Sequence, residues 1–383
     1  MKMWMAIVIV SLVLFAGCAS QQNVPHVPAP QPQGNNSTAQ SGSLPSAPQQ
    51  PVQPSNTSNQ TTPSGNPGLI GGQGVGDACD NCTNVANASQ NNSDENILGF
   101  AGEWGSYGTG NGQFTYPRGI AFDSEGNVYV ADSGNNRVQK FDLSGKYIAQ
   151  FGSFGSGNGQ FVYPNGIAVD SAGNVYVADS GNARVQKFDS SGKYIAQFGG
   201  SGSRNGQFVY NNGIAVDSAG KVYVADSGNG RVQIFDSSGK YIAQFGSFGG
   251  GNGQFVYNNG IAVDSAGKVY VADSGNHRVQ IFDSSGKYIA QFGGIGRGNG
   301  QFTYNNGIAV DLKGNVYVAD SGNARIQIFD SSGKYVAQFG SIGSGNGQFY
   351  NQNGIAVDSE GGVYVADSGN FRIQIFDSSG TRQ

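Results

Sequence analysis

The sequence predicts an all-β protein whose main domain is a six-bladed β-propeller, with four antiparallel strands in each blade. The motif Gly-Gln-Phe begins at residues 112, 159, 206, 253, 300 and 347, so every interval is 47 residues. A repeat of this length is typical of stacked or radial architectures. The chain of 383 residues also contains 63 Gly and only 12% charged residues. This composition favours short strands and tight turns over amphipathic helices.

One repeat, residues 163–209, divides into four strand-like segments. The first, 166–170, is short and apolar, which suits a buried strand at the centre of a ring. The segments 175–179, 184–188 and 193–198 follow, and the last two alternate between polar and apolar residues. Ser, Gly and Asn between these segments are typical turn residues. Six such units closed into a ring would protect the edges of their sheets.

The two ends of the repeat region complement each other. The last repeat stops at Gln383, where its fourth strand should begin, and residues 99–104 (GFAGEW) align with that missing strand. In this alignment Phe100 matches Tyr147 and Trp104 matches Phe151. We therefore predict that the N-terminal strand 99–104 completes the last blade and closes the ring of a domain spanning 97–383.

The repeat itself resembles a known family. The string YPNGIAVDSAGNVYVADSGNARVQKFDSSGKYIAQFG, residues 163–199, is similar to NHL repeats, which build six-bladed propellers. The resemblance extends over residues 99–383. Proteins of this family include sensor domains of bacterial receptor kinases, RNA-binding regulators and the peptidylglycine amidating lyase. The resemblance therefore implies the fold and leaves the function to the site.

The N-terminus carries targeting features. Residues 1–17 contain one Lys and an uncharged run from Met3 to Ala16, which is typical of a signal peptide. The segment Leu14-Phe15-Ala16-Gly17-Cys18 resembles a prokaryotic lipobox, which implies lipidation of Cys18 and a lipid anchor at the cell surface or envelope. An ordinary signal or an uncleaved anchor is the alternative. Residues 18–73, rich in Pro, Gln, Ser and Asn, read as a disordered tether.

Residues 74–96, GVGDACDNCTNVANASQNNSDEN, resemble a degenerate thrombospondin type 3 repeat. The resemblance implies calcium ligands at matching positions, namely Asp77, Asp80, Asn92, Asp94 and Asn96. Leu69, Gly71 and Gln73 stand where that family has acidic ligands, so the alternative is a relic spacer without calcium. In an exported chain, Cys79 and Cys82 are expected to form a local disulfide, with a redox-active pair as the alternative.

Candidate ligand-binding positions lie where the six copies differ. The repeated Asp132 and Arg137, with their equivalents, are expected to pair and to be structural. Two variable loops, before the third strand and at the start of the first, should share one face of a four-stranded blade. Their aromatic, charged and polar residues form the candidate site: Tyr116, Arg118, Asn136, Tyr163, Tyr210, Tyr257, His277, Tyr304 and Phe371.

These residues indicate a non-catalytic binding or scaffold propeller for a protein, peptide or glycan at the cell envelope. We expect no cofactor apart from calcium in residues 74–96, and membrane attachment by the lipid anchor alone. With 21 basic and 25 acidic residues and no basic run, nucleic acid is not an expected partner. The alternative is a lyase or hydrolase with a metal in the central channel. The repeats contain one His, His277, and no Cys, so no catalytic residues are assigned.

Overall fold

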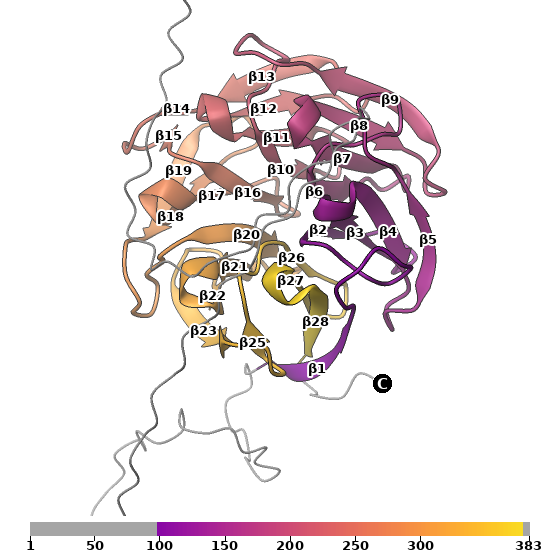
Figure 1. The fold of residues 1–383 in the computed structure, drawn as a ribbon. Helices are drawn as coiled ribbons and strands as arrows, with labels where there is room; N and C mark the ends of the chain where they lie inside the picture. The colour runs from indigo at the N-terminus through magenta and orange to yellow at the C-terminus, as the bar shows by residue number, and fades with distance from the viewer. Residues whose placement is uncertain (1–97, 378–383) are drawn as a thin grey trace, which may run out of the picture. The chain divides into compact units, whose positions relative to one another are not determined.

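The computed structural model describes residues 98–377, and these residues form the six-bladed propeller expected from the repeat (Figure 1). Six four-stranded antiparallel sheets surround a central axis. The innermost strands contact one another in order, and β26 (Ile355–Val357) contacts β2 (Pro117–Phe122), which closes the ring. No helix among these residues is long and apolar enough to cross a membrane.

The blades follow the chain from the inside outward. Blade 1 contains β2, β3 (Val128–Asp132), β4 (Arg137–Phe141) and β5 (Tyr147–Phe151). Blade 2 contains β6 (Pro164–Val169), β7 (Val175–Asp179), β8 (Arg184–Phe188) and β9 (Tyr194–Gly199). Blade 3 contains β10 (Asn211–Val216), β11 (Val222–Asp226), β12 (Arg231–Phe235) and β13 (Tyr241–Phe245).

The second half of the ring repeats this order. Blade 4 contains β16 (Asn258–Val263), β17 (Val269–Asp273), β18 (Arg278–Phe282) and β19 (Tyr288–Gly293). Blade 5 contains β20 (Asn305–Val310), β21 (Val316–Asp320), β22 (Arg325–Phe329) and β23 (Tyr335–Phe339). Blade 6 contains β26, β27 (Val363–Asp367), β28 (Arg372–Asp377) and β1 (Gly99–Trp104).

Short elements lie in the loops between these strands. A 3-10 turn joins the second and third strand of every blade: η1 (Ser133–Asn135), η2 (Ser180–Asn182), η3 (Ser227–Asn229), η4 (Ser274–Asn276), η5 (Ser321–Asn323) and η6 (Ser368–Asn370). Two small parallel pairs join blades 3 and 4 and blades 5 and 6: β14 (Ser247–Phe248) with β15 (Gln254–Phe255), and β24 (Ser341–Ile342) with β25 (Gln348–Phe349).

The innermost strands begin and end earlier than the sequence pattern predicted. The second blade's inner strand was expected at 166–170, whereas β6 spans Pro164–Val169. Asp170 leaves the strand because its Oδ1 accepts hydrogen bonds from the backbone N–H groups of Ala172, at 3.0 Å, and Asn174, at 2.8 Å. An Asp that accepts from its own turn in this way ends the strand.

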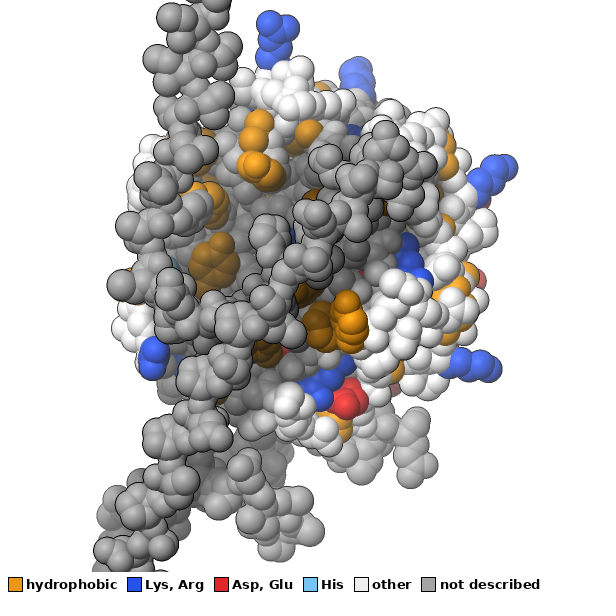
Figure 2. Space-filling model, in the orientation of Figure 1, with side chains coloured by type: hydrophobic (Ala, Val, Ile, Leu, Met, Phe, Trp, Pro, Cys, Tyr) orange, Lys and Arg blue, Asp and Glu red, His pale blue; other side chains and the backbone are white. Residues whose placement is uncertain are grey.

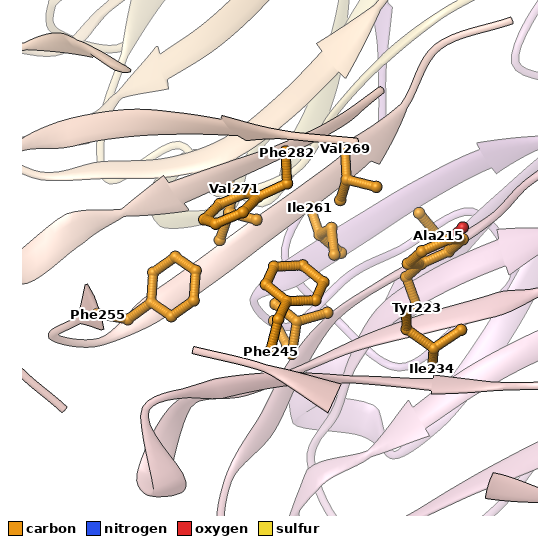
Figure 3. Packing of buried hydrophobic residues seen from close by; sticks show 11 residues of the cluster. Ala215, Tyr223, Ile234, Phe245, Phe255, Ile261, Val269, Val271 and Phe282 are labelled. Carbon is orange, nitrogen blue, oxygen red and sulfur yellow. The ribbon is translucent and has the colours of Figure 1, made fainter. Parts of the chain in front are cut away.

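The hydrophobic core lies between neighbouring blades. Figure 3 shows one such cluster, in which Tyr223 and Phe245 of blade 3 pack against Ile261, Val269 and Phe282 of blade 4. The ring centroids of Phe245 and Phe282 are 4.6 Å apart. Each blade therefore depends on its neighbours for burial of its apolar faces, and the ring has to be closed for all six clusters to be complete.

The closing contact is the expected one. β1 pairs antiparallel with β28, with Glu103 opposite Gln374 and Trp104 opposite Ile373. Glu103 occupies the position that Gln150 holds in blade 1, and its Oε2 lies 2.6 Å from Nη1 of Arg372. The N-terminal strand thus joins the last blade by both backbone pairing and an ion pair.

The six repeated Asp–Arg pairs are internal scaffold, as expected. In blade 3 the Nε of Arg231 lies 2.8 Å from Oδ2 of Asp226, and both side chains are buried. The Nη2 of Arg231 also donates to the backbone carbonyls of Arg204 and Gln207. Each pair therefore fastens the loop that enters a blade to the second and third strands of that blade.

A glycine in each inner strand sets how closely neighbouring blades approach at the axis. A Cβ added to Gly213 would lie 2.3 Å from the backbone oxygen of Asn259 in the next blade. We expect Gly213→Ala to lower the free energy of unfolding by about 1–3 kcal/mol, because the backbones must separate. Chemical denaturation measures this loss. Gly250→Ala is the control, since its Cβ would meet only the Asn276 Oδ1, at 3.6 Å. Equal stabilities of the two variants would contradict the prediction.

Candidate ligand-binding site at the channel mouth

The two variable loops lie on one face of the propeller, as predicted. The loop before the first strand of each blade is hydrogen-bonded to the 3-10 turn of the same blade, for example from Gly134 N–H to the Thr115 carbonyl at 2.7 Å. This loop face carries the 3-10 turns and is turned toward the viewer in Figure 1. The inner strands begin here, so residues at their first positions surround the mouth of the central channel.

A chain of asparagine side chains surrounds this mouth. It contains one residue from each of blades 2 to 6: Asn165, Asn212, Asn259, Asn306 and Asn353. Each of the first four donates a hydrogen bond from Nδ2 to Oδ1 of the next, at 3.0–3.3 Å. The Nδ2 of all five also donates to the Ser Oγ of the adjacent 3-10 turn, at 2.8–3.1 Å. Both N–H groups of every amide are therefore used within the protein.

The serines extend the same network to the next blade. The hydroxyl groups of Ser180, Ser227, Ser274, Ser321 and Ser368 donate to backbone carbonyls at the start of the following inner strand. A fully hydrogen-bonded polar network of this kind is rigid. The floor of the channel mouth is therefore preformed.

Blade 1 interrupts the asparagine chain. Arg118 stands at the position of the asparagines, and its Nη1 donates to Oδ1 of Asn165 at 2.7 Å. Arg118 forms no ion pair with any residue in the range 98–377. Desolvation at the channel mouth lowers the pKa of Arg118, and the neighbouring Tyr304 raises it. An arginine keeps its proton under all such conditions, so the mouth holds a positive charge.

The mouth is a hollow with a volume of about 370 Å³. Its walls are formed by Arg118, Tyr304 and Asn351, together with the asparagine chain and the glycines that follow it. Ligand pockets in proteins begin at about this size. Of the nine ligand-binding residues proposed from the sequence, Arg118 and Tyr304 line this hollow.

The other predicted tyrosines surround the hollow without lining it. The exposed fraction of the side chains at the five tyrosine positions is 44–69%: Tyr116, Tyr163, Tyr210, Tyr257 and Tyr304. The first four have φ between 52° and 55°, as has Asn351 of blade 6 at 56°. This left-handed conformation is uncommon for a bulky residue and carries strain.

Phe371 belongs to a cluster at the edge of this tyrosine ring. Its ring centroid lies 5.6 Å from that of Tyr116 and 4.9 Å from that of Tyr107. Asn136 is tied to the loop that enters blade 2, because its Oδ1 accepts from the Tyr163 backbone N–H at 2.9 Å. His277 is half-buried at the end of η4, and its Nδ1 is buried without a hydrogen-bond partner among residues 98–377.

An outer row of exposed apolar side chains was not identified from the sequence. Its members are 47 residues apart, and their exposed fractions are 56–73%: Tyr107, Phe154, Phe248, Ile295 and Ile342. Ser201 occupies this position in the third repeat. Figure 2 shows apolar side chains at intervals around this face. The sequence signal was available, because this column stays large and apolar in five repeats although it is not a core position.

The opposite mouth is acidic. Its walls include Asp123, Asp170, Asp311, Asp358 and Glu360, which lie just after the inner strands. Burial raises the pKa of Asp123, but hydrogen bonds from Asn127 and the charge of Lys140 outweigh it, so the net shift is downward. The Oδ2 of Asp123 lies 3.3 Å from Nζ of Lys140. Within residues 98–377, no group of three or more His, Cys, Asp or Glu could hold a metal ion.

Several predictions from the sequence lie outside the described residues. They are the signal peptide with Cys18, the tether, the calcium ligands from Asp77 to Asn96, and the pair Cys79 and Cys82. These remain predictions.

Comparison with known proteins relates the blades to a sequence family. Six segments match the family model described as NHL repeat: 114–141, 161–188, 212–235, 259–282, 302–329 and 351–376. Among curated proteins, the B-box type zinc finger protein ncl-1 of Caenorhabditis elegans is 42% identical over 45 residues. That segment is 12% of this chain and 5% of the other protein, so the two share one repeat-sized region.

Two solved structures show the same architecture. A Bacteroides thetaiotaomicron protein of unknown function superimposes with a TM-score of 0.58 and 20% identity, covering 73% of this chain and 75% of the other. A gluconolactonase from Xanthomonas campestris superimposes with a TM-score of 0.53 and 15% identity, covering 70% and 87%. At these identities the likeness concerns the fold alone.

Proposed function

We propose that the propeller formed by the six NHL repeats is a non-catalytic binding module. Its ligand is a protein, peptide or glycan that contacts the loop face around the channel mouth. The observation that carries this proposal is the hollow at that mouth, which Arg118 and Tyr304 line. Arg118 is positively charged and has no acidic partner within residues 98–377, and further exposed tyrosines lie on the same face. Charged and aromatic groups of this kind dominate recognition surfaces.

Preorganisation of the mouth supports the proposal. The asparagines and serines are fixed by hydrogen bonds that run from blade to blade, so a ligand would not have to order them. Binding to such a surface loses little conformational entropy. The tyrosines offer aromatic faces for stacking and hydroxyl groups for hydrogen bonding, which suits polar, neutral stretches of peptide or sugar.

The alternative, a lyase or hydrolase with a metal in the channel, requires converging ligands. His277 lies at the end of η4 and does not line either channel mouth. The likeness to a gluconolactonase extends to the fold. The described residues therefore favour the binding module as the working proposal, and stoichiometric binding of a metal ion by the purified protein would favour the enzyme instead.

The proposal includes a place for the module. We propose that lipidated Cys18 and the tether at 18–73 present the propeller at a prokaryotic cell surface. Mass spectrometry of the mature N-terminus tests this part, because a diacylglyceryl group on Cys18 has a defined mass and an ordinary signal leaves none.

The loop face is tested by removing aromatic rings without disturbing the backbone. Asn351 already occupies the tyrosine position in blade 6 with φ 56°, and Asn tolerates that conformation well. We therefore expect the triple variant Tyr163→Asn, Tyr210→Asn, Tyr257→Asn to fold. We expect it to bind an envelope partner about tenfold or more weakly, because each aromatic contact contributes about 0.5–1.5 kcal/mol.

Affinity capture from envelope extracts with the full-length chain measures this effect, followed by titration of the captured partner. The control is Ile148→Asn, Ile195→Asn, Ile242→Asn, which changes three outer-strand side chains of 47–48% exposure away from the loop face. A partner lost by the tyrosine variant and kept by the control supports the loop face. A partner kept by the tyrosine variant, or lost by both, contradicts it.

A further inference from the structure

We infer that the channel mouth binds a singly charged carboxylate group, with Arg118 as its principal donor. This inference rests on the proposed function, because it names the chemistry that the same hollow accepts. Blade 1 has Arg118 at the position where each of the other five blades has an asparagine.

The hydrogen bonds around the mouth have a direction. Arg118 donates to Asn165, and each asparagine donates to the next until Asn353. An asparagine at position 118 would accept from Asn353 and would complete the ring. Arginine has no acceptor, so the Nδ2 of Asn353 donates instead to the backbone carbonyl of Asn351, at 3.3 Å.

Arg118 also has a cost within its own blade. In blades 2 to 6 the asparagine donates to the serine of the 3-10 turn, and that serine donates to the next blade. In blade 1 the equivalent hydroxyl, Oγ of Ser133, is buried and has no hydrogen-bond partner among residues 98–377. A buried hydroxyl without a partner is destabilising. A departure from the repeat that weakens the scaffold is expected where a function requires it.

Arg118 supplies most of the donors left free at the mouth. Its guanidinium group has five N–H groups, and one hydrogen bond, to Asn165, is formed with the residues that the structure describes. The amide N–H groups of the five asparagines in the chain from Asn165 to Asn353 are already used. The hydroxyl of Tyr304, which makes no hydrogen bond within residues 98–377, is a second donor in the same wall. The hollow thus offers a planar, charged donor with two neutral donors beside it, the hydroxyl of Tyr304 and the side-chain amide of Asn351.

This set of donors matches a carboxylate. A guanidinium group and a carboxylate form two parallel hydrogen bonds, and the charges of +1 and −1 cancel. A phosphate dianion would keep a net charge of −1 beside the single positive charge of Arg118. The volume of about 370 Å³ admits the end of a chain or a single sugar ring. A peptide C-terminus and a uronic acid both present this group.

The test uses two pairs of probes and two variants of the full-length chain. Each pair contains one acid and its uncharged counterpart: N-acetyl-Ala-Ala with its amide, and glucuronate with glucose. Arg118→Asn restores the residue of the other five blades. Arg204→Asn removes the same charge from an exposed side chain that forms no hydrogen bond or ion pair with the residues that the structure describes. Ligand-observed NMR titration gives the affinities, and chemical denaturation gives the stabilities.

We expect an acid to bind the parent and Arg204→Asn, and to bind Arg118→Asn about tenfold or more weakly. The acid that binds better identifies the source of the carboxylate. We also expect Arg118→Asn to be at least as stable as the parent, because the asparagine ring closes and Ser133 gains a partner. Lower stability of Arg118→Asn would instead make Arg118 a scaffold residue and would overturn the inference.

Three binding results would also overturn it. The first is that no acid binds, the second is that acids bind no better than their uncharged counterparts, and the third is that acids bind equally well to Arg118→Asn. These failures are separate from a failure of the proposed function, which depends on the tyrosine variant and the captured envelope partner. If the tyrosine variant loses that partner, the loop face is still the binding surface, even when the inference of a carboxylate ligand is overturned.

Discussion

Replacing Asp226 by Asn is expected to lower the free energy of unfolding by about 3–5 kcal/mol, the range for removal of one partner from a buried ion pair. Asp226 is 0% exposed and Arg231 is 6% exposed. The Oδ2 of Asp226 accepts from Arg231 at 2.8 Å, from Asn229 at 2.9 Å and from Gln233 at 3.1 Å. Its Oδ1 accepts from the Val209 backbone N–H at 2.8 Å.

Asp226→Asn is expected to destabilise the fold for a geometric reason as well as an electrostatic one. An Asn side chain at position 226 has one oxygen, and its amide nitrogen would face either the Val209 N–H or the three donors on the other side. Arg231 would then be a buried cation without a counter-charge. The expected loss of stability exceeds that from the lost hydrogen bonds alone, because the substitution also removes the counter-charge of the buried Arg231.

Chemical denaturation monitored by fluorescence or circular dichroism measures this loss. The control is Asp236→Asn, directly after the next strand of the same blade, where the carboxylate caps an exposed turn by accepting from Ser238 and from the Lys240 backbone N–H. These hydrogen bonds hold the pKa of Asp236 below its usual value, but water can replace them. A loss at Asp226 no larger than the loss at Asp236 would show that the buried pairs are dispensable to the scaffold.

The architecture could be predicted from the sequence because the repeat has a constant length, so the strands assigned to one repeat apply to every blade. The six copies of the 47-residue repeat predicted the number of blades. The alignment of residues 99–104 with the strand that ends at Phe151 predicted the closing strand. The structure has Trp104 opposite Ile373, the same register in which Phe151 lies opposite Val138 in blade 1. The Asp–Arg pairs were also expected, since two charged residues repeated together must be satisfied together.

The organisation of the mouth could not be predicted in the same way. The asparagine chain depends on side chains from neighbouring blades, 47 residues apart, meeting at hydrogen-bonding distance around the axis. Sequence shows the column of asparagines but not the direction of their hydrogen bonds. For the same reason the sequence did not separate Tyr304, which lines the hollow, from Tyr210, which projects from the face with φ 55°. The sequence identified Arg118 as a position where the repeats differ, and the structure shows that this difference interrupts the chain of asparagine hydrogen bonds.

The seam between the first and last strands is the second place where a large effect is expected. Trp104 packs between blades 6 and 1, with ring centroids 6.0 Å from Tyr364 and 5.6 Å from Phe141. We expect Trp104→Ala to lower the free energy of unfolding by about 3 kcal/mol or more, because the cavity removes contacts on both sides of the seam. β1 has no chain connection to β28, so lost packing there is not compensated by a covalent turn.

The effect of this missing connection can be measured by hydrogen exchange, with blade 2 as the control. Phe198 of blade 2 occupies the equivalent position and lies 4.7 Å from Phe235, but its strand β9 continues from β8 through a turn. Phe198→Ala should therefore lower overall stability while leaving the β8–β9 amides protected. Trp104→Ala should in addition expose the amides of β28 that pair with β1 to rapid hydrogen exchange. Equal protection of both sheets in the two variants would mean that the Glu103–Arg372 ion pair and the backbone ladder close the ring without the indole, and that closure does not depend on packing at the seam.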